Sequence, residues 1–353
     1  MLVGALTLGA CSGDDGGEAV ADEGVNLDSG GVATSAADTG ADDTGAPGSA
    51  TDSADDGPSA DTMSVDDGPD DPGDPPIVFD LGALPDAPEL TSACSKVDFL
   101  FVIDNSGSMS TYQQRLIDNF PVFINGIQDS LDDVMTYQVG VVTTDNYTPN
   151  AAGCNGLPSL VVQTGGSNSS NAVCGPYNEG FNFMTEQDDL SSSFSCAAQI
   201  GSSGSGLELT MQAVEGAVTK TEGGIGQCNE GFIRDDALLV IVIITDEADG
   251  PGDPDGAPGT GTSLGDPTSW FEAIVAAKMG IPENIVVLSL INYAGGSCPP
   301  VFPFEDGQNI ADFTTMFGAN GFLGGICELD YEPMFTQAVG VIDEACENFV
   351  APS

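Results

Sequence analysis

The sequence contains no histidine and very few basic side chains. Five Lys and Arg stand against 55 Asp and Glu, which gives a net charge of −50. Without histidine, Ser-His-Asp and Cys-His catalytic sites are excluded, as is any zinc site that needs imidazole. With so few cations, no basic patch could neutralise the phosphates of a nucleic acid, so we expect no nucleic-acid partner. Lys220 and Lys278 fall in expected helices, so no general base is evident and we expect a protein that is not an enzyme.

One stretch combines a long apolar run with a cluster of oxygen-bearing side chains. The run Val97–Ile103 predicts a central strand buried on both faces, and it stops at Asp104. Ser106 and Ser108 follow on a short loop. Ligands of open α/β sheets bind beyond the carboxyl ends of the strands. Carboxylate and hydroxyl oxygens there suit a hard divalent cation, of which we expect Mg²⁺ first, with Mn²⁺ and Ca²⁺ as alternatives. The simpler alternative is a turn whose Asp caps the next helix.

Strands alternate with helices along the rest of the chain. This order predicts an α/β fold, a doubly wound and mostly parallel sheet flanked by helices. The expected strands are 97–104, 136–144, 237–245, 284–292 and 322–327. The expected helices are 109–130, 206–220, 270–280, 310–317 and 333–349, with a kink or break at Pro121.

The D-x-S-x-S pattern of Asp104, Ser106 and Ser108 resembles the motif that opens the metal-ion-dependent adhesion site (MIDAS) of von Willebrand factor type A (vWA) domains. The resemblance implies a Rossmann-like vWA fold over roughly residues 97–349. It also implies that two further loops contribute to the metal site. Ser203 takes the place of a threonine that precedes a helix, with Ser202 or Ser205 as alternatives. Asp246, which directly follows the run 237–245, is the residue that the third loop contributes to the site.

The same resemblance implies how such a site acts. One coordination position stays open for an Asp or Glu side chain of a protein partner, so we expect a metal-dependent adhesion or protein-binding module. An acidic, cation-binding envelope protein and, less favoured, a metal-assisted hydrolase are the alternatives. Residues 143–145 end a neighbouring strand and either border the site or form a simple turn. We expect the acidic loop 249–256 to be a surface loop, with an accessory Ca²⁺ site as the alternative.

The first 76 residues have a different character from the rest. Residues 1–11 resemble the end of a bacterial lipoprotein signal, with Cys11 as the lipidated residue, although no Lys or Arg precedes the apolar run. Residues 12–76 hold 18 acidic and no basic side chains and almost no large apolar ones, which predicts a disordered linker. We therefore expect an exported protein that is anchored to the cell envelope, at the outer membrane, only through lipid.

The remaining 77–353 form the expected vWA domain, with insertions at about 146–205 and 293–325. Eight cysteines remain after Cys11 is set aside, an even number that fits four disulfides in an exported protein. Cys94 and Cys346 flank the domain, and we expect them to pair. Nearest-neighbour pairing of the others gives Cys154–Cys174, Cys196–Cys228 and Cys298–Cys327.

Overall fold

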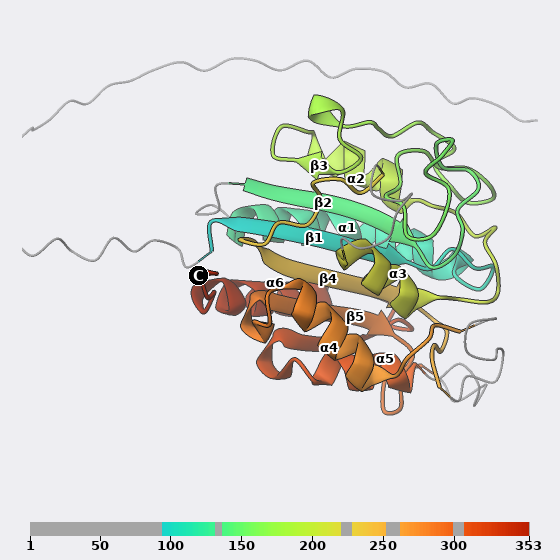
Figure 1. The fold of residues 1–353 in the computed structure, drawn as a ribbon. Coiled ribbons are helices and arrows are strands. Elements are labelled where there is room, and N and C mark those ends of the chain that lie inside the picture. The colour runs from blue at the N-terminus through green and yellow to red at the C-terminus, as the bar shows by residue number, and fades with distance from the viewer. Residues whose placement is uncertain (1–93, 131–135, 220–227, 252–261, 299–306, 353) are drawn as a thin grey trace, which may run out of the picture. The chain divides into compact units, whose positions relative to one another are not determined.

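A computed structural model describes residues 94–130, 136–219, 228–251, 262–298 and 307–352. Six strands form one sheet in the order β3-β2-β1-β4-β5-β6, in which only the pairing of β3 with β2 is antiparallel (Figure 1). The strands are β1 (Lys96–Ile103), β2 (Thr136–Thr143), β3 (Met184–Thr185), β4 (Leu238–Thr245), β5 (Ile285–Ile291) and β6 (Gly321–Gly325). The sequence-based prediction of a mostly parallel sheet is confirmed.

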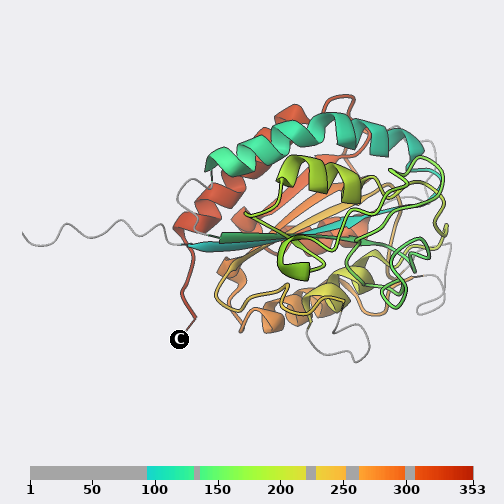
Figure 2. The ribbon, with the colours of Figure 1, turned by 90° about the horizontal axis from the view of Figure 1, so that it is seen from above.

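Helices cover both faces of this sheet, as Figure 2 shows. One face carries α1 (Ser110–Ser130), α2 (Leu190–Ala198) and α6 (Glu332–Glu347). The other carries α3 (Thr210–Val218), α4 (Pro267–Ala277) and α5 (Gln308–Thr315). Three single-turn 3₁₀ helices lie at residues 178–180, 282–284 and 318–320. This three-layer arrangement is a Rossmann-like, doubly wound α/β fold.

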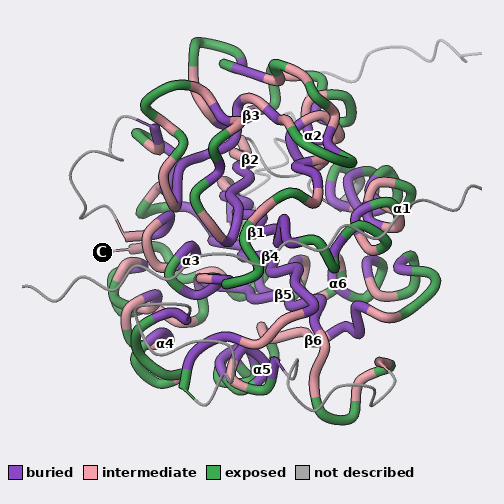
Figure 3. Tube along the Cα trace, turned by 90° about the vertical axis from the view of Figure 1, so that its right-hand side faces the viewer, coloured by how far each residue is buried: buried purple, intermediate pink, exposed green. Residues whose placement is uncertain are grey.

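The side chains of β1 alternate between two hydrophobic cores because successive residues of a strand point to opposite faces. Phe99 and Phe101 pack on the α1 side, whereas Leu100 and Val102 pack on the α3 side. Phe101 lies 4.6 Å from Phe194 of α2, measured between ring centroids, so the long insertion contributes directly to the first core. Figure 3 shows the strands as a buried centre surrounded by more exposed segments.

The order of the strands places a topological switch point between β1 and β4. The chain passes from β1 outward to β2, then returns across β1 to β4 and continues to β5 and β6. Ligands of doubly wound sheets bind at such a point, beyond the carboxyl ends of the strands. Asp104 and Asp246 follow β1 and β4 directly, and the Asp104 N–H donates to the Ile244 carbonyl at 2.9 Å. The fold therefore brings the two predicted strand-end carboxylates to one edge.

The helix break that was the alternative to a kink at Pro121 was wrong. Helix α1 runs unbroken through Pro121, whose side chain is exposed, so water can satisfy the carbonyl that lacks a partner N–H. The run 160–163 of the insertion lies in no named strand, but the Val161 N–H donates to the Val141 carbonyl of β2 at 2.8 Å. The segment 293–325, which was expected to be an insertion, contains helix α5 and strand β6 of the sheet.

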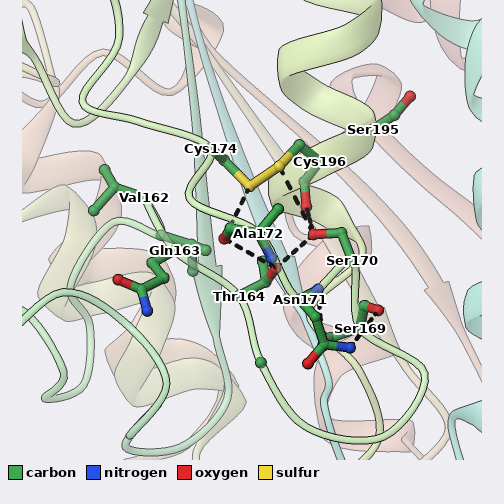
Figure 4. The surroundings of a disulfide bond; sticks show 12 residues. Val162, Gln163, Thr164, Ser169, Ser170, Asn171, Ala172, Cys174, Ser195 and Cys196 are labelled. Atoms are coloured by element: carbon green, nitrogen blue, oxygen red, sulfur yellow. Dashed lines mark hydrogen bonds between the residues drawn. A yellow bond between two sulfur atoms is a disulfide. The ribbon is translucent and has the colours of Figure 1, made fainter.

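All eight predicted cysteines are paired, but two of the four expected pairs were wrong. Cys94–Cys346 and Cys298–Cys327 form as expected. The others are Cys154–Cys228 and Cys174–Cys196 in place of the nearest-neighbour pairs. The reason is helix α2, which the sequence analysis did not predict: it carries Cys196 back to the strand-like segment that holds Cys174 (Figure 4).

The expected signal segment, Cys11 and the linker 12–76 lie outside the described residues. Within the parts that are described, no helix combines the length and apolar character needed to cross a bilayer.

Candidate metal centre

Asp104 is the buried centre of the predicted site. Its Oδ1 accepts a hydrogen bond from the Ser106 N–H at 2.7 Å, and its Oδ2 accepts one from the Thr245 hydroxyl at 2.7 Å. The side chain is fully buried, and this burial raises its pKa above the usual range, with the Asp145 charge acting in the same direction. The hydrogen bonds to the carboxylate oppose the shift. A buried carboxylate with both oxygens engaged is fixed in position, which is what a metal ligand requires.

A chain of hydroxyls joins the first loop to the third. Ser106 Oγ and Ser108 Oγ lie 2.8 Å apart, and the Ser108 hydroxyl donates to Asp246 Oδ1 at 3.0 Å. Ser106 is buried, whereas Ser108 is exposed. Four of the five predicted site residues, all but Ser203, are thus linked at the switch point between β1 and β4. Ser108 is the exposed end of this series of hydroxyls, so a ligand could approach from that side.

The second loop, residues 201–209, is held by contacts with the ends of β1 and β2. Gln113 of α1 is buried, and its amide donates to the carbonyls of Asp104 and Gly201 and accepts from the Gly201 N–H. The Gly204 N–H donates to the Asn105 carbonyl at 2.7 Å. Gln113 therefore links the first loop to the second. This role was not predicted, because the sequence of α1 does not indicate which of its polar side chains faces the loops.

Asp145 at the end of β2 also joins the two loops. It accepts hydrogen bonds from the Asn105 amide at 3.0 Å and from the Ser205 N–H at 2.6 Å. Thr143 donates to the Asp145 carbonyl at 2.9 Å, which shapes the turn. Of the two alternatives for residues 143–145, the structure favours a strand end that borders the site.

Ser203 has a different environment from the other predicted ligands. Its Oγ accepts a hydrogen bond from the Ser167 N–H at 2.9 Å, and it faces the turn at Gly166, where a Cβ would lie 3.0 Å from the hydroxyl. The alternative Ser202 accepts from the Asn168 amide at 2.7 Å. The hydroxyl of the alternative Ser205 accepts from the Leu207 N–H at 3.0 Å. These serines are thus engaged within the insertion and the second loop.

The second loop instead places an acidic side chain in the interior. Glu208 is only 2 % exposed, and the Thr144 hydroxyl donates to its Oε2. Its other oxygen, Oε1, has no hydrogen-bond partner. Burial, together with the nearby charge of Asp104, raises the pKa of Glu208 to about 10. A buried acid beside Asp104 was not predicted, because the expected helix 206–220 included Glu208 and gave no sign that it lies at the edge of the sheet.

The late start of helix α3 explains the position of Glu208. The helix begins at Thr210, not at residue 206, and the carboxylate of Asp249 accepts from the Met211 N–H at 2.7 Å and from the Ser263 hydroxyl at 2.7 Å. Asp249 is fully buried, so this part of the acidic loop is a helix cap rather than a solvated surface. The rest of the possible accessory site, residues 252–256, lies outside the described residues.

The oxygens at this edge fit a hard divalent cation. Carboxylate and hydroxyl groups are the ligands that Mg²⁺, Mn²⁺ and Ca²⁺ prefer. Two buried acceptors, Asn105 Oδ1 and Glu208 Oε1, have no hydrogen-bond donor, and oxygen acceptors of this kind are suited to a cation. Within the described ranges no three Asp, Glu, Cys or His side chains form a metal-binding group by themselves. Any ion at this edge would therefore depend on the hydroxyls of Ser106 and Ser108 as well.

A hollow of about 390 Å³ lies beside the second loop. Its walls combine leucine side chains with amides and one carboxylate. The lining residues are Asp145, Asn146, Leu157, Ser205, Leu207, Leu209 and Gln212. Because Asp145 and Ser205 also contact each other next to Asn105, the hollow adjoins the candidate metal centre.

Comparisons with known proteins found neither a matching family model nor a matching curated protein. Among solved structures, proximal thread matrix protein 1 from the mussel byssus matches with 12 % identity and a TM-score of 0.39, over 71 % of this chain and 49 % of that one. The same protein with a zinc-occupied MIDAS motif matches with 13 % identity and a TM-score of 0.36, over 72 % and 46 %. The pilus adhesin SpaC from Lactobacillus rhamnosus GG matches with 10 % identity and a TM-score of 0.36, over 72 % and 30 %. The matched region spans half or less of each of these proteins, and the likeness is one of fold.

Proposed function

We propose that this protein is a divalent-cation-dependent adhesion module that binds a partner protein. One observation carries the proposal: Ser108 bridges to Asp246 beside the buried Asp104, so the first and third loops meet at the switch point of the sheet. A turn that merely capped α1 would not need Asp246 from a strand 138 residues further along the chain. The convergence of two strand ends is what a shared ligand requires.

The cation that we propose is Mg²⁺, with Mn²⁺ and Ca²⁺ as substitutes. Asp104, Ser106, Ser108 and Asp246 would hold it, and the cation would supply a positive centre for an acidic group. Two carboxylates offset the charge of a divalent ion, so an Asp or Glu side chain of a partner can still be attracted at short range. The net charge of −50 opposes the approach of an acidic partner at long range, and salt screens this repulsion.

The surroundings of the centre suit a protein partner. Ser108 is exposed, and the hollow of about 390 Å³ next to the second loop offers both apolar and hydrogen-bonding walls. Such mixed concave surfaces fit side chains that flank an anchoring residue. We therefore expect the partner to contact the centre with one acidic residue and the hollow with its neighbours.

The side chains near the centre favour binding over catalysis. Asp104 is fully buried and each of its oxygens accepts a hydrogen bond, so it presents no exposed nucleophile for a metal-assisted hydrolase. Lys278 is buried and donates to the carbonyls of Arg234 and Ala237, so its ammonium group stabilises the fold and offers no base. We propose that the protein has no enzymatic role.

We also propose that the module is exported and tethered to the bacterial cell envelope at the outer membrane. Four disulfides are typical of proteins that fold in an oxidising compartment. The sequence around Cys11 supplies the candidate lipid anchor, and the acidic segment 12–76 supplies a linker of low hydrophobicity.

Isothermal titration of Mg²⁺, Mn²⁺ and Ca²⁺ into the metal-stripped full chain tests the function. We expect one saturable site that is lost in Asp104→Ala and retained in Glu272→Gln, which removes an exposed carboxylate of α4. The acidic linker is present in every variant, so diffuse binding to it cancels in the comparison. Equal heats from the wild type and Asp104→Ala would refute the metal centre and the adhesion module with it.

A further inference from the structure

Glu208 is the one buried carboxylate of the described residues with an oxygen that lacks a hydrogen bond. Four buried side-chain atoms have no partner there, and Glu208 Oε1 is the only carboxylate oxygen among them. The residue is 2 % exposed, so bulk water does not solvate it. A buried carboxyl group normally has an opposite charge beside it, hydrogen bonds to both oxygens or a bound metal.

Two other buried carboxylates of this fold have hydrogen bonds to both of their oxygens. Asp98 pairs with Arg234, whose Nε donates to Oδ1 at 2.7 Å and whose N–H donates to Oδ2 at 2.7 Å. Asp249 accepts three hydrogen bonds, from the Met211 N–H and from the N–H and hydroxyl of Ser263, each at 2.7 Å. Glu208 receives only the hydrogen bond from Thr144. Its environment is therefore incomplete in a way that those of Asp98 and Asp249 are not.

The register of the sheet places Glu208 next to the candidate metal centre. Ile103 of β1 is paired with both Thr143 of β2 and Ile244 of β4, so Asp104, Thr144 and Thr245 come next in three adjacent strands. Leu100, Val102, Val142 and Ile243 pack on the α3 face, and alternation directs Asp104, Thr144 and Thr245 to that same face.

Hydrogen bonds confirm this row of side chains. Thr245 donates to Asp104, and Thr144 donates to Glu208. The Leu209 N–H also donates to the Thr144 carbonyl at 2.9 Å, which fixes the backbone beside Glu208. Neighbouring strands lie about 4.8 Å apart, so the Thr144–Glu208 contact is one strand away from Asp104.

We propose that Glu208, and not Ser203, is the side chain through which the second loop holds the divalent cation. This inference rests on the metal centre of the proposed function and names its missing ligand. Glu208 would then hold the cation together with Asp104 from the buried side, while Asp246 acts through Ser108, since no three acidic side chains converge on one point within the described ranges. A carboxyl group near the cation holds it more firmly, and leaves an acidic group of a partner less firmly attracted, than a hydroxyl at the same position would.

Two substitutions in the same loop separate the carboxylate from the hydroxyl. Glu208→Gln keeps the size and an acceptor oxygen but removes the carboxyl group, whereas Ser203→Ala removes the hydroxyl and leaves Glu208 intact. Mn²⁺ and Ca²⁺ are titrated calorimetrically into the metal-stripped full chain of the wild type, both variants and Asp104→Ala. Thermal unfolding with and without the ion gives a second readout, because an ion bound only to the folded state raises the unfolding temperature.

We expect Glu208→Gln to weaken ion binding at least tenfold and to lose most of the ion-dependent rise in unfolding temperature. Ser203→Ala should bind within about twofold of the wild type, since its hydroxyl serves only Ser167. Wild-type affinity in Glu208→Gln, or a loss in Ser203→Ala alone, would overturn the inference while leaving the metal centre standing. An absence of any saturable binding that depends on Asp104 would remove the proposed function itself.

Discussion

The first and second loops at the edge of the sheet are built in different ways. The first loop combines contacts among its own residues with contacts from β4: the Ser106 N–H donates to Asp104 and Ser106 contacts Ser108, while Thr245 donates to Asp104 and Ser108 donates to Asp246. The second loop is ordered from outside, by Gln113 of α1, by Asn105 and Asp145 and by the turn at Ser167. Contacts within a short sequence motif can be predicted from the sequence, whereas contacts with partners far away in the sequence cannot.

The largest effect should come from removing the centre of the first loop. Asp104→Asn keeps the shape of the side chain but lowers the charge at the centre, so we expect cation affinity to fall at least 100-fold, which corresponds to about 2.7 kcal/mol. At an ion concentration 1,000 times the wild-type dissociation constant, the wild type should gain about 4 kcal/mol of unfolding free energy, and the variant at most about 1.4 kcal/mol. Denaturant unfolding with and without Mn²⁺ measures both, and equal gains would contradict the account.

Removing the disulfide that supports the second loop should have the next largest effect. Cys174–Cys196 ties α2 to the segment that leads to Ser167, and the Ser170 hydroxyl also donates to the Cys196 carbonyl at 2.9 Å (Figure 4). We expect the double alanine variant to lose about 2–4 kcal/mol of unfolding free energy and to bind the cation more weakly.

The matched control is the pair Cys94–Cys346, which joins the start of β1 to the end of α6. Its double alanine variant should lose stability without a comparable change in cation affinity of the folded protein. If loss of either disulfide changes cation affinity to the same degree, the second loop is not supported specifically by the Cys174–Cys196 disulfide of the insertion.

Gln113→Ala tests the fastening between the two loops. The substitution leaves the Gly201 N–H and carbonyl without partners in a buried position, which should cost about 2–3 kcal/mol of unfolding free energy. Gln114→Ala, one residue along the same helix, removes only an exposed contact with Asp118 and should change the free energy by less than about 0.5 kcal/mol. Chemical denaturation of the two variants distinguishes them, and similar losses would argue against the fastening role.

Gly204→Ala should give the smallest of these effects. A Cβ at Gly204 would lie 2.4 Å from the Asn105 amide nitrogen and 2.8 Å from the Asn105 carbonyl oxygen, so the second loop must shift away from the first. We expect a loss of about 1–2 kcal/mol, within the range for overpacking. Gly206→Ala has nothing within 4 Å of its Cβ and should be neutral or slightly stabilising. A neutral Gly204→Ala would show that the two loops are not closely packed.

Much of the fold could be predicted because its signals are local. The buried runs that end at Asp104 and Asp246 marked the central strands and the first and third loops of the candidate centre. The pairing of Cys154 with Cys228 could not be predicted, because it depends on how the insertion folds back over the sheet. The position of Glu208 could not be predicted either, because α3 starts late only when Asp249, from a loop after β4, caps it.

A crystal structure of the full chain grown with Mn²⁺, with the ion located by its anomalous scattering, tests the central claim most directly. The account predicts one ion at the switch point between β1 and β4, bound by Ser106 Oγ and Ser108 Oγ, with the carboxylates of Asp104 and Glu208 facing it from the buried side. An ion bound elsewhere, or no ion at this edge at saturating Mn²⁺, would contradict it.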